Sequence, residues 1–178
     1  MKIVVMTGSP HREGTSALLA RKFEEGAREA GHEIYRFDAA FEQVHPCIGC
    51  DKCGCGANPC VFRDAMDKLY PKLCEADLIA FVTPLYYHGP SAQLKAAVDR
   101  FHGIDDFLRG ADKRAVLIAA AADARARVTR GLEAEYEETL NYLGWRDAGR
   151  VLALSCYYRA DIEKTDYPEA AYRLGRNL

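Results

Sequence analysis

Two stretches of this 178-residue chain combine residue types at spacings that can do chemistry. The first is the loop from Thr7 to Ser16 (TGSPHREGTS), where glycines, hydroxyls and a basic pair follow the apolar run IVVM. The second is a cluster that holds five of the seven cysteines, between Cys47 and Cys60. We therefore expect one loop that binds an anion and one group of thiols that needs a separate explanation.

The loop at 7–16 is typical of a turn from a buried strand into a helix. Such a turn leaves the first N–H groups of the helix unpaired, and these groups, with the helix dipole, favour an anion. The triphosphate pattern GxxxxGK[ST] and the dinucleotide pattern GxGxxG are both absent from the loop. We expect a single phosphate monoester, held by hydroxyls and amides.

The cysteine cluster has the spacing CxxCxxC, followed by Cys60, with Cys55 in between. Thiolates at this spacing can converge on one centre and would suit tetrahedral zinc. A redox-active or empty thiol loop is the other interpretation that the residues alone leave open.

Composition excludes several classes of protein. A net charge of -2 with 49% hydrophobic and 28% charged residues is that of an ordinary soluble globular protein, and no polybasic patch suggests nucleic acid. We find no signal peptide and no apolar run of membrane-spanning length, so we expect a cytoplasmic protein that binds neither membrane nor nucleic acid. Cytosolic thiols stay reduced, so disulfides are not expected.

Strand and helix patterns alternate five times along the chain. Apolar or alternating runs predict strands at 3–6, 32–37, 78–83, 115–120 and 151–154, and helical spacing predicts helices at about 15–30, 64–74, 91–108, 128–143 and 168–176. Pro71 predicts a kink or break in the second helix. This order indicates a doubly wound α/β fold, whose ligands lie beyond the carboxyl ends of the strands. The loops at 7–16, 84–90 and 119–126 leave from those ends.

Three motifs in this order resemble the flavodoxin-like NADPH-dependent FMN reductase family, particularly its iron–sulfur flavoprotein branch. They are GSP with GTS at 8–16, CIGCDKC at 47–53 and TPLYYHG at 83–89. The resemblance implies a five-stranded parallel sheet of order 2-1-3-4-5 in a three-layer α/β/α arrangement, a bound FMN, and a homodimer or homotetramer. We expect one domain over 1–178, with a Cys-rich insertion at about 40–63.

The resemblance also implies which residues bind FMN. The phosphate would lie in the first loop, at Ser9, Pro10, His11, Gly14, Thr15, Ser16 and Ala17. The family often has arginine where this chain has His11, with Arg12 next to it, so either side chain could reach the phosphate. The isoalloxazine ring would contact Pro84, Leu85, Tyr86, Tyr87 and Gly89, and the segment from Ala120 through Ala121 to Asp123 would complete the wall. Cys156, after the fifth strand, either lines the site or ends the core.

In the iron–sulfur branch, four cysteines of this kind hold a cubane cluster, and the matching set here is Cys47, Cys50, Cys53 and Cys60. The resemblance thus adds a [4Fe-4S] cluster to the alternatives of zinc or no metal. The activity it implies is electron transfer from NAD(P)H through FMN to a quinone, nitro or azo compound, flavin or similar acceptor. The alternative is an iron–sulfur flavoprotein that carries electrons between ferredoxin-like partners. We expect no catalytic acid, base or nucleophile, because the flavin carries out the chemistry.

Overall fold

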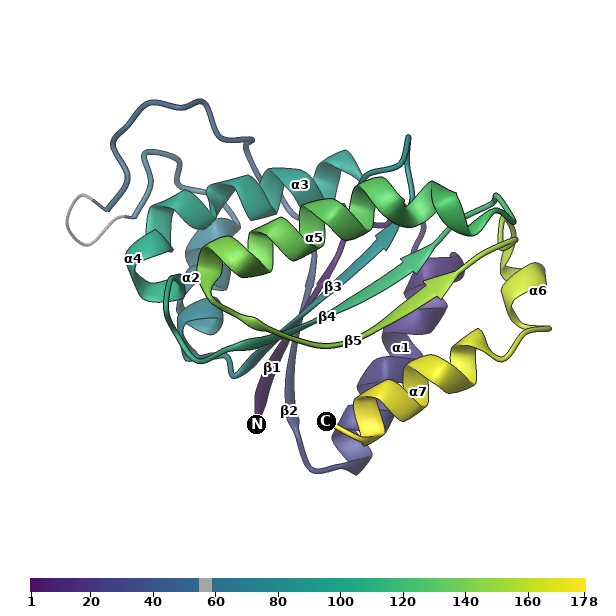
Figure 1. Ribbon diagram of the computed structural model, residues 1–178. Coiled ribbons are helices and arrows are strands. Elements are labelled where there is room, and N and C mark those ends of the chain that lie inside the picture. Colours follow the sequence, from purple (N-terminus) through teal and green to yellow (C-terminus); the bar gives the residue numbers. More distant parts are fainter. Residues whose placement is uncertain (55–58) are drawn as a thin grey trace.

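The computed structural model describes residues 1–54 and 59–178, and its centre is a five-stranded parallel sheet (Figure 1). The strands are β1 (Lys2–Thr7), β2 (Glu33–Asp38), β3 (Leu78–Pro84), β4 (Arg114–Ala120) and β5 (Arg146–Ala153). The helices are α1 (Thr15–Glu29), α2 (Met66–Glu75), α3 (Ala92–Asp99), α4 (Asp105–Leu108), α5 (Arg130–Leu143), α6 (Arg159–Ile162) and α7 (Tyr167–Arg176), with 3-10 helices η1 (Arg100–Ile104) and η2 (Ala126–Thr129). The strand order β2-β1-β3-β4-β5 confirms the predicted topology.

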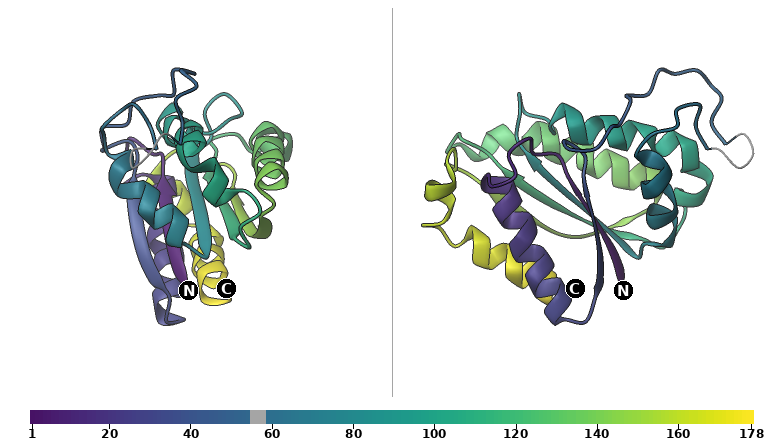
Figure 2. Two further views of the ribbon diagram at one scale, coloured as in Figure 1. Left: turned by 90° about the vertical axis from the view of Figure 1, so that its left-hand side faces the viewer. Right: turned by 180° about the vertical axis from the view of Figure 1, so that it is seen from behind.

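Helices cover both faces of the sheet because the strands are apolar on both faces. β3 is buried along its whole length, as a central parallel strand must be. One apolar core lies under α2, α3 and α5, and a second lies under α1 and α7. Figure 2 shows α1 and α7 side by side, on the opposite face from α3 and α5. The three-layer α/β/α expectation is therefore confirmed.

Two helical predictions differ from the structure, for local physical reasons. No break occurs at Pro71: α2 continues through it, because Leu69 and Tyr70 before the proline and Leu73 after it are buried in the core. The single helix expected at 91–108 is divided into α3, η1 and α4. The change to tighter turns begins at Arg100, whose side chain is drawn inward to a buried ion pair with Asp64.

Across 1–54 and 59–178, no helix is both long enough and apolar enough to span a membrane.

Candidate functional site

A cleft of about 790 Å³ opens where β1, β3 and β4 end, at the point where the strand order reverses. Its volume lies within the range of small-molecule sites. Nine of the residues expected to bind a cofactor line it: Ser9, Pro10, His11, Gly14, Thr15, Pro84, Leu85, Tyr86 and Ala120. The fold thus brings the first and second predicted loops, 75 residues apart at Ser9 and Pro84, to one site.

One end of the cleft is the uncapped amino terminus of α1. Its N-cap residue is Gly14, which offers no side-chain acceptor, and the helical hydrogen bonds begin with Leu18 N–H donating to the Gly14 carbonyl at 3.1 Å. The N–H groups of the first turn therefore have no partner within the helix. Ser16 Oγ in this turn is also buried and makes no hydrogen bond to the part of the chain that the structure describes.

The loop that precedes α1 is held by its own side chains. Ser9 Oγ accepts a hydrogen bond from His11 N–H at 3.1 Å and lies 3.3 Å from the His11 carbonyl. Arg12 also lines the cleft, but its guanidinium lies over the Phe41 ring, 3.7 Å from the centroid. Both basic side chains therefore border the anion end.

The second wall is the tight turn that follows β3. Leu85 N–H donates to the Ala120 carbonyl at 2.8 Å, which ties the wall to β4. Tyr86 and Gly89 exchange two backbone hydrogen bonds across Tyr87 and His88, which both have positive φ angles of 47° and 70°. This two-residue turn points Tyr87 into solvent, where it is fully exposed.

Six residues expected at the site do not line the cleft: Ser16, Ala17, Tyr87, Gly89, Ala121 and Asp123. The first two are buried in the first turn of α1, beneath the lining. Side chains alternate after β4, so Ala120 and Ala122 face the cleft while Ala121 is buried, its N–H bonded to the Ala153 carbonyl. Asp123 forms an ion pair with Arg125, which lowers the pKa of that carboxyl.

The segment after β5 supplies a further wall, in which Cys156 was one of the sequence-based alternatives and the three residues that follow it were not expected. Cys156, Tyr157, Tyr158 and Arg159 all line the cleft. The two tyrosine rings meet edge to face, 4.6 Å apart, and both are about two-thirds exposed. The sheet topology could have indicated this wall, since the loop after a fifth parallel strand must leave from the same edge of the sheet as the other site loops.

Glu13 also lines the cleft, and its negative charge is balanced by ion pairs. Arg159 contacts the Glu13 carboxylate at 2.9 Å, and Arg21 contacts it at 3.1 Å. Cys156 is buried, and this burial raises the pKa of its thiol, so we assign it a packing role in the wall.

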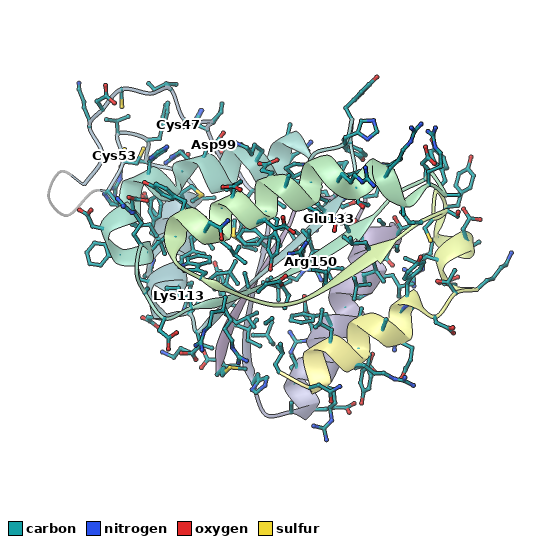
Figure 3. The ribbon with its side chains drawn as sticks, viewed as in Figure 1. Cys47, Cys53, Asp99, Lys113, Glu133 and Arg150 are labelled. Atoms are coloured by element: carbon teal, nitrogen blue, oxygen red, sulfur yellow. The ribbon has the colours of Figure 1, made fainter. Side chains whose placement is uncertain are left out.

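The four cysteines of the predicted metal set border a separate cavity of about 360 Å³. Figure 3 shows two of them, Cys47 and Cys53, on the loop that projects from the end of the molecule opposite α6. Burial raises the pKa of the Cys53 thiol, and the neighbouring thiols of Cys60, Cys47 and Cys50 raise it further. Nevertheless, no three His, Cys, Asp or Glu side chains in 1–54 and 59–178 are grouped as metal ligands. Cys55 lies outside the described residues.

The base of this loop is closed by a buried ion pair. Arg100 Nη1 donates to Asp64 Oδ2 at 2.7 Å and to the His45 carbonyl at 2.8 Å. The two charged side chains are 1% and 2% exposed. Asp64 also accepts the His45 and Met66 N–H groups, so the two ends of the loop are joined at residues 45 and 64.

This chain is similar to a known protein family and to several named proteins. Residues 1–156 match the family model for NADPH-dependent FMN reductase. An iron–sulfur flavoprotein of Methanocaldococcus jannaschii is 38% identical over 100 residues, which cover 56% of this chain and 51% of that protein. An iron–sulfur flavoprotein of Archaeoglobus fulgidus is 35% identical over 125 residues, covering 68% of this chain and 62% of that protein.

The solved structure of an NAD(P)H:quinone oxidoreductase from Methanothermobacter marburgensis superposes with a TM-score of 0.72 at 18% identity. That match covers 100% of this chain and 96% of the other, and it supports the flavodoxin-like fold. This chain spans only about half to two-thirds of the length of the two curated relatives. The family match, which extends over all five strands and over the loops at 7–16 and 84–90, shows that the chain belongs to the NADPH-dependent FMN reductase family.

Proposed function

We propose that this chain binds one FMN in the cleft and transfers electrons from NADH or NADPH to a quinone, a nitro or azo compound, free flavin or a similar acceptor. The observation that carries the proposal is the joining of an uncapped helix terminus to an aromatic wall in one cleft. The free helix terminus suits a phosphate, and the aromatic wall suits a planar ring.

The residues at the anion end fit the phosphate of FMN. The first-turn N–H groups of α1 can donate to phosphate oxygens, and the unpartnered Ser16 hydroxyl is buried in the same turn. His11 and Arg12 supply basic side chains, while Arg21 and Arg159 form ion pairs with Glu13, a carboxylate that lines the cleft. The local field therefore favours a dianion despite the net negative charge of the chain.

The other walls fit the flavin ring. Leu85 and Tyr86 lie between the β3 and β4 ends, and Tyr157 and Tyr158 close the side that follows β5. Bound FMN would supply the hydride and electron transfer chemistry itself. The protein's part is to bind the phosphate, orient the ring and keep water from one of its faces.

Anaerobic mixing of the FMN-loaded protein with NADH or NADPH tests this function. We expect the flavin absorbance near ~450 nm to bleach, and we expect it to return when a quinone or nitro compound is added. An FMN-loaded protein that neither nucleotide bleaches would contradict the reductase function.

A second candidate is an electron carrier between ferredoxin-like partners. The relatives named iron–sulfur flavoprotein and the cavity bordered by Cys47, Cys50, Cys53 and Cys60 favour it. Because the described side chains do not form a metal-ligand group, we derive no step through a cluster. Iron and acid-labile sulfide in anaerobically purified protein would favour the carrier, and so would flavin that a reduced ferredoxin bleaches but NAD(P)H does not.

A further inference from the structure

Two fully buried hydroxyls lie between the two loops that line the cleft. Ser91 follows the tight turn after β3, and its Oγ donates to the Gly8 carbonyl at 2.7 Å. Thr83, in β3, accepts the Ser91 N–H at 2.9 Å and donates to the Pro84 carbonyl at 2.8 Å. These bonds connect the phosphate end to the ring wall through the interior of the protein.

The approach of Ser91 to the first loop requires glycine at position 8. A Cβ atom there would lie 2.2 Å from Ser91 Oγ and 2.6 Å from Leu94 Cβ, well inside contact distance. Gly8 N–H in turn donates to the Val82 carbonyl in β3 at 2.9 Å. The residue is therefore held on its N–H side by the sheet and on its carbonyl side by Ser91.

The peptide that joins Gly8 to Ser9 takes its orientation from this bond. In a trans peptide the carbonyl and the following N–H point in opposite directions. Because the Gly8 carbonyl is turned to Ser91 at the start of α3, the Ser9 N–H is turned away from α3. In the described part of the chain, this N–H donates to no backbone or side-chain acceptor. Ser9 itself lines the cleft.

We propose that Ser91 is a positioning residue for phosphate binding, which aims the Ser9 N–H into the anion end of the cleft by holding the Gly8 carbonyl. This inference rests on the proposed binding of FMN and adds to it a residue outside the lining. Ser91 also caps α3, but that contact, from Leu94 N–H, is the longer one at 3.4 Å. The bond that Ser91 Oγ donates to the Gly8 carbonyl, at 2.7 Å, has the geometry of a stronger hydrogen bond.

The test compares the affinities of flavin-free protein for FMN and for riboflavin, which lacks the phosphate. Ser91→Ala should weaken FMN binding by about tenfold and riboflavin binding by less than about twofold, so the preference for FMN falls. It should also shift the ³¹P resonance of bound FMN. Equal weakening of both ligands, or an unchanged resonance and preference, would overturn the positioning role.

Tyr70→Phe is the matched control, because it also removes one buried hydroxyl hydrogen bond, to the Arg100 carbonyl at 3.2 Å, away from the cleft. Its FMN preference should equal that of the wild type. If Ser91→Ala does not fold, Ser91→Cys keeps the side chain's length with a weaker donor and should lower the preference in the same direction. Wild-type protein that binds no FMN would instead refute the proposed function.

Discussion

The flavin cleft and the cysteine loop are attached to the fold in opposite ways. Each wall of the cleft is tied to a neighbouring strand by backbone hydrogen bonds, as Leu85 is to Ala120 and Ala121 is to Ala153. The cysteine loop is held mainly at its base, where Arg100 and Asp64 join residues 45 and 64. Figures 1 and 2 show it projecting from the end of the molecule away from α6, whose first residue lines the cleft.

The sheet therefore preorganises the cleft, whereas the cysteine loop is held by contacts at its base, among them the Arg100–Asp64 ion pair and the bond from Ala65 N–H to the Gln43 carbonyl at 3.0 Å. A ligand in the cleft meets backbone groups that are already oriented, so little ordering has to accompany binding. The thiols border a cavity but do not form a ligand group among the described residues. Changes at the loop's base should therefore alter stability, and changes in the cleft should alter flavin affinity.

The largest effect is expected from Arg100→Met, which leaves Asp64 buried without its cation. We expect a loss of about 3–5 kcal/mol in the free energy of unfolding, measured by urea denaturation. Below the denaturation transition, the affinity for FMN should stay near that of the wild type. A parallel loss of FMN affinity would show that the two regions are not independent.

Lys2→Met is the control for this variant. It breaks an ion pair with Glu75 of similar length, 2.9 Å, but both partners are about half exposed. Solvent screens such a pair, so no measurable change in stability is expected.

The next largest effect is expected from Thr15→Asp, at the first position of α1. An acidic residue in the first turn stabilises the helix, so the fold should persist, while its charge repels a phosphate. We expect FMN affinity to fall roughly a hundredfold, about 2–3 kcal/mol, in a fluorescence titration. The neutral Thr15→Asn should lose far less, and equal losses in the two variants would contradict the phosphate placement.

Regions whose geometry is set locally could be predicted from the sequence, whereas regions that depend on how distant segments pack could not. The individual strands and the loop at 7–16 follow from local patterns, because apolar runs and a strand-to-helix turn impose their own geometry, whereas the order of the strands rested on the family resemblance. Tyr158 was not assigned to the site, since its place depends on how the segment after β5 folds back over the sheet edge. Tyr87 is expected in the wall, but it lies in a left-handed turn that directs it into solvent. The two turn residues, Tyr87 and His88, include no glycine or asparagine that would predict such a turn.

A smaller effect is expected from removing the aromatic wall. Tyr157→Ala combined with Tyr158→Ala should weaken FMN binding about fivefold, because the ring loses contact area on one side of the cleft. Tyr142→Ala removes a tyrosine that is also more than half exposed but does not line the cleft, so it should leave the affinity unchanged. Unchanged affinity in the double variant would remove these tyrosines from the proposed site.

The smallest effect concerns the response of the loop's base to pH. Burial alone would raise the pKa of Asp64, but hydrogen bonds from Arg100 and from the His45 and Met66 N–H groups outweigh it and lower the pKa. A lowered pKa stabilises the fold above the unfolded value of about 3.9, and this stabilisation is lost as the pH falls through the folded pKa. Stability measured against pH should fall less steeply in acid for Asp64→Asn than for the wild type, and parallel curves would contradict this account.

A titration of the flavin-free wild-type protein with FMN and, separately, with riboflavin, followed by flavin fluorescence, tests whether the cleft binds the phosphate of FMN. We expect saturable binding of one FMN per chain, at least about tenfold tighter than riboflavin, because the uncapped terminus of α1 would bind the phosphate. Equal affinity for the two flavins, or no saturable binding of FMN, would contradict it.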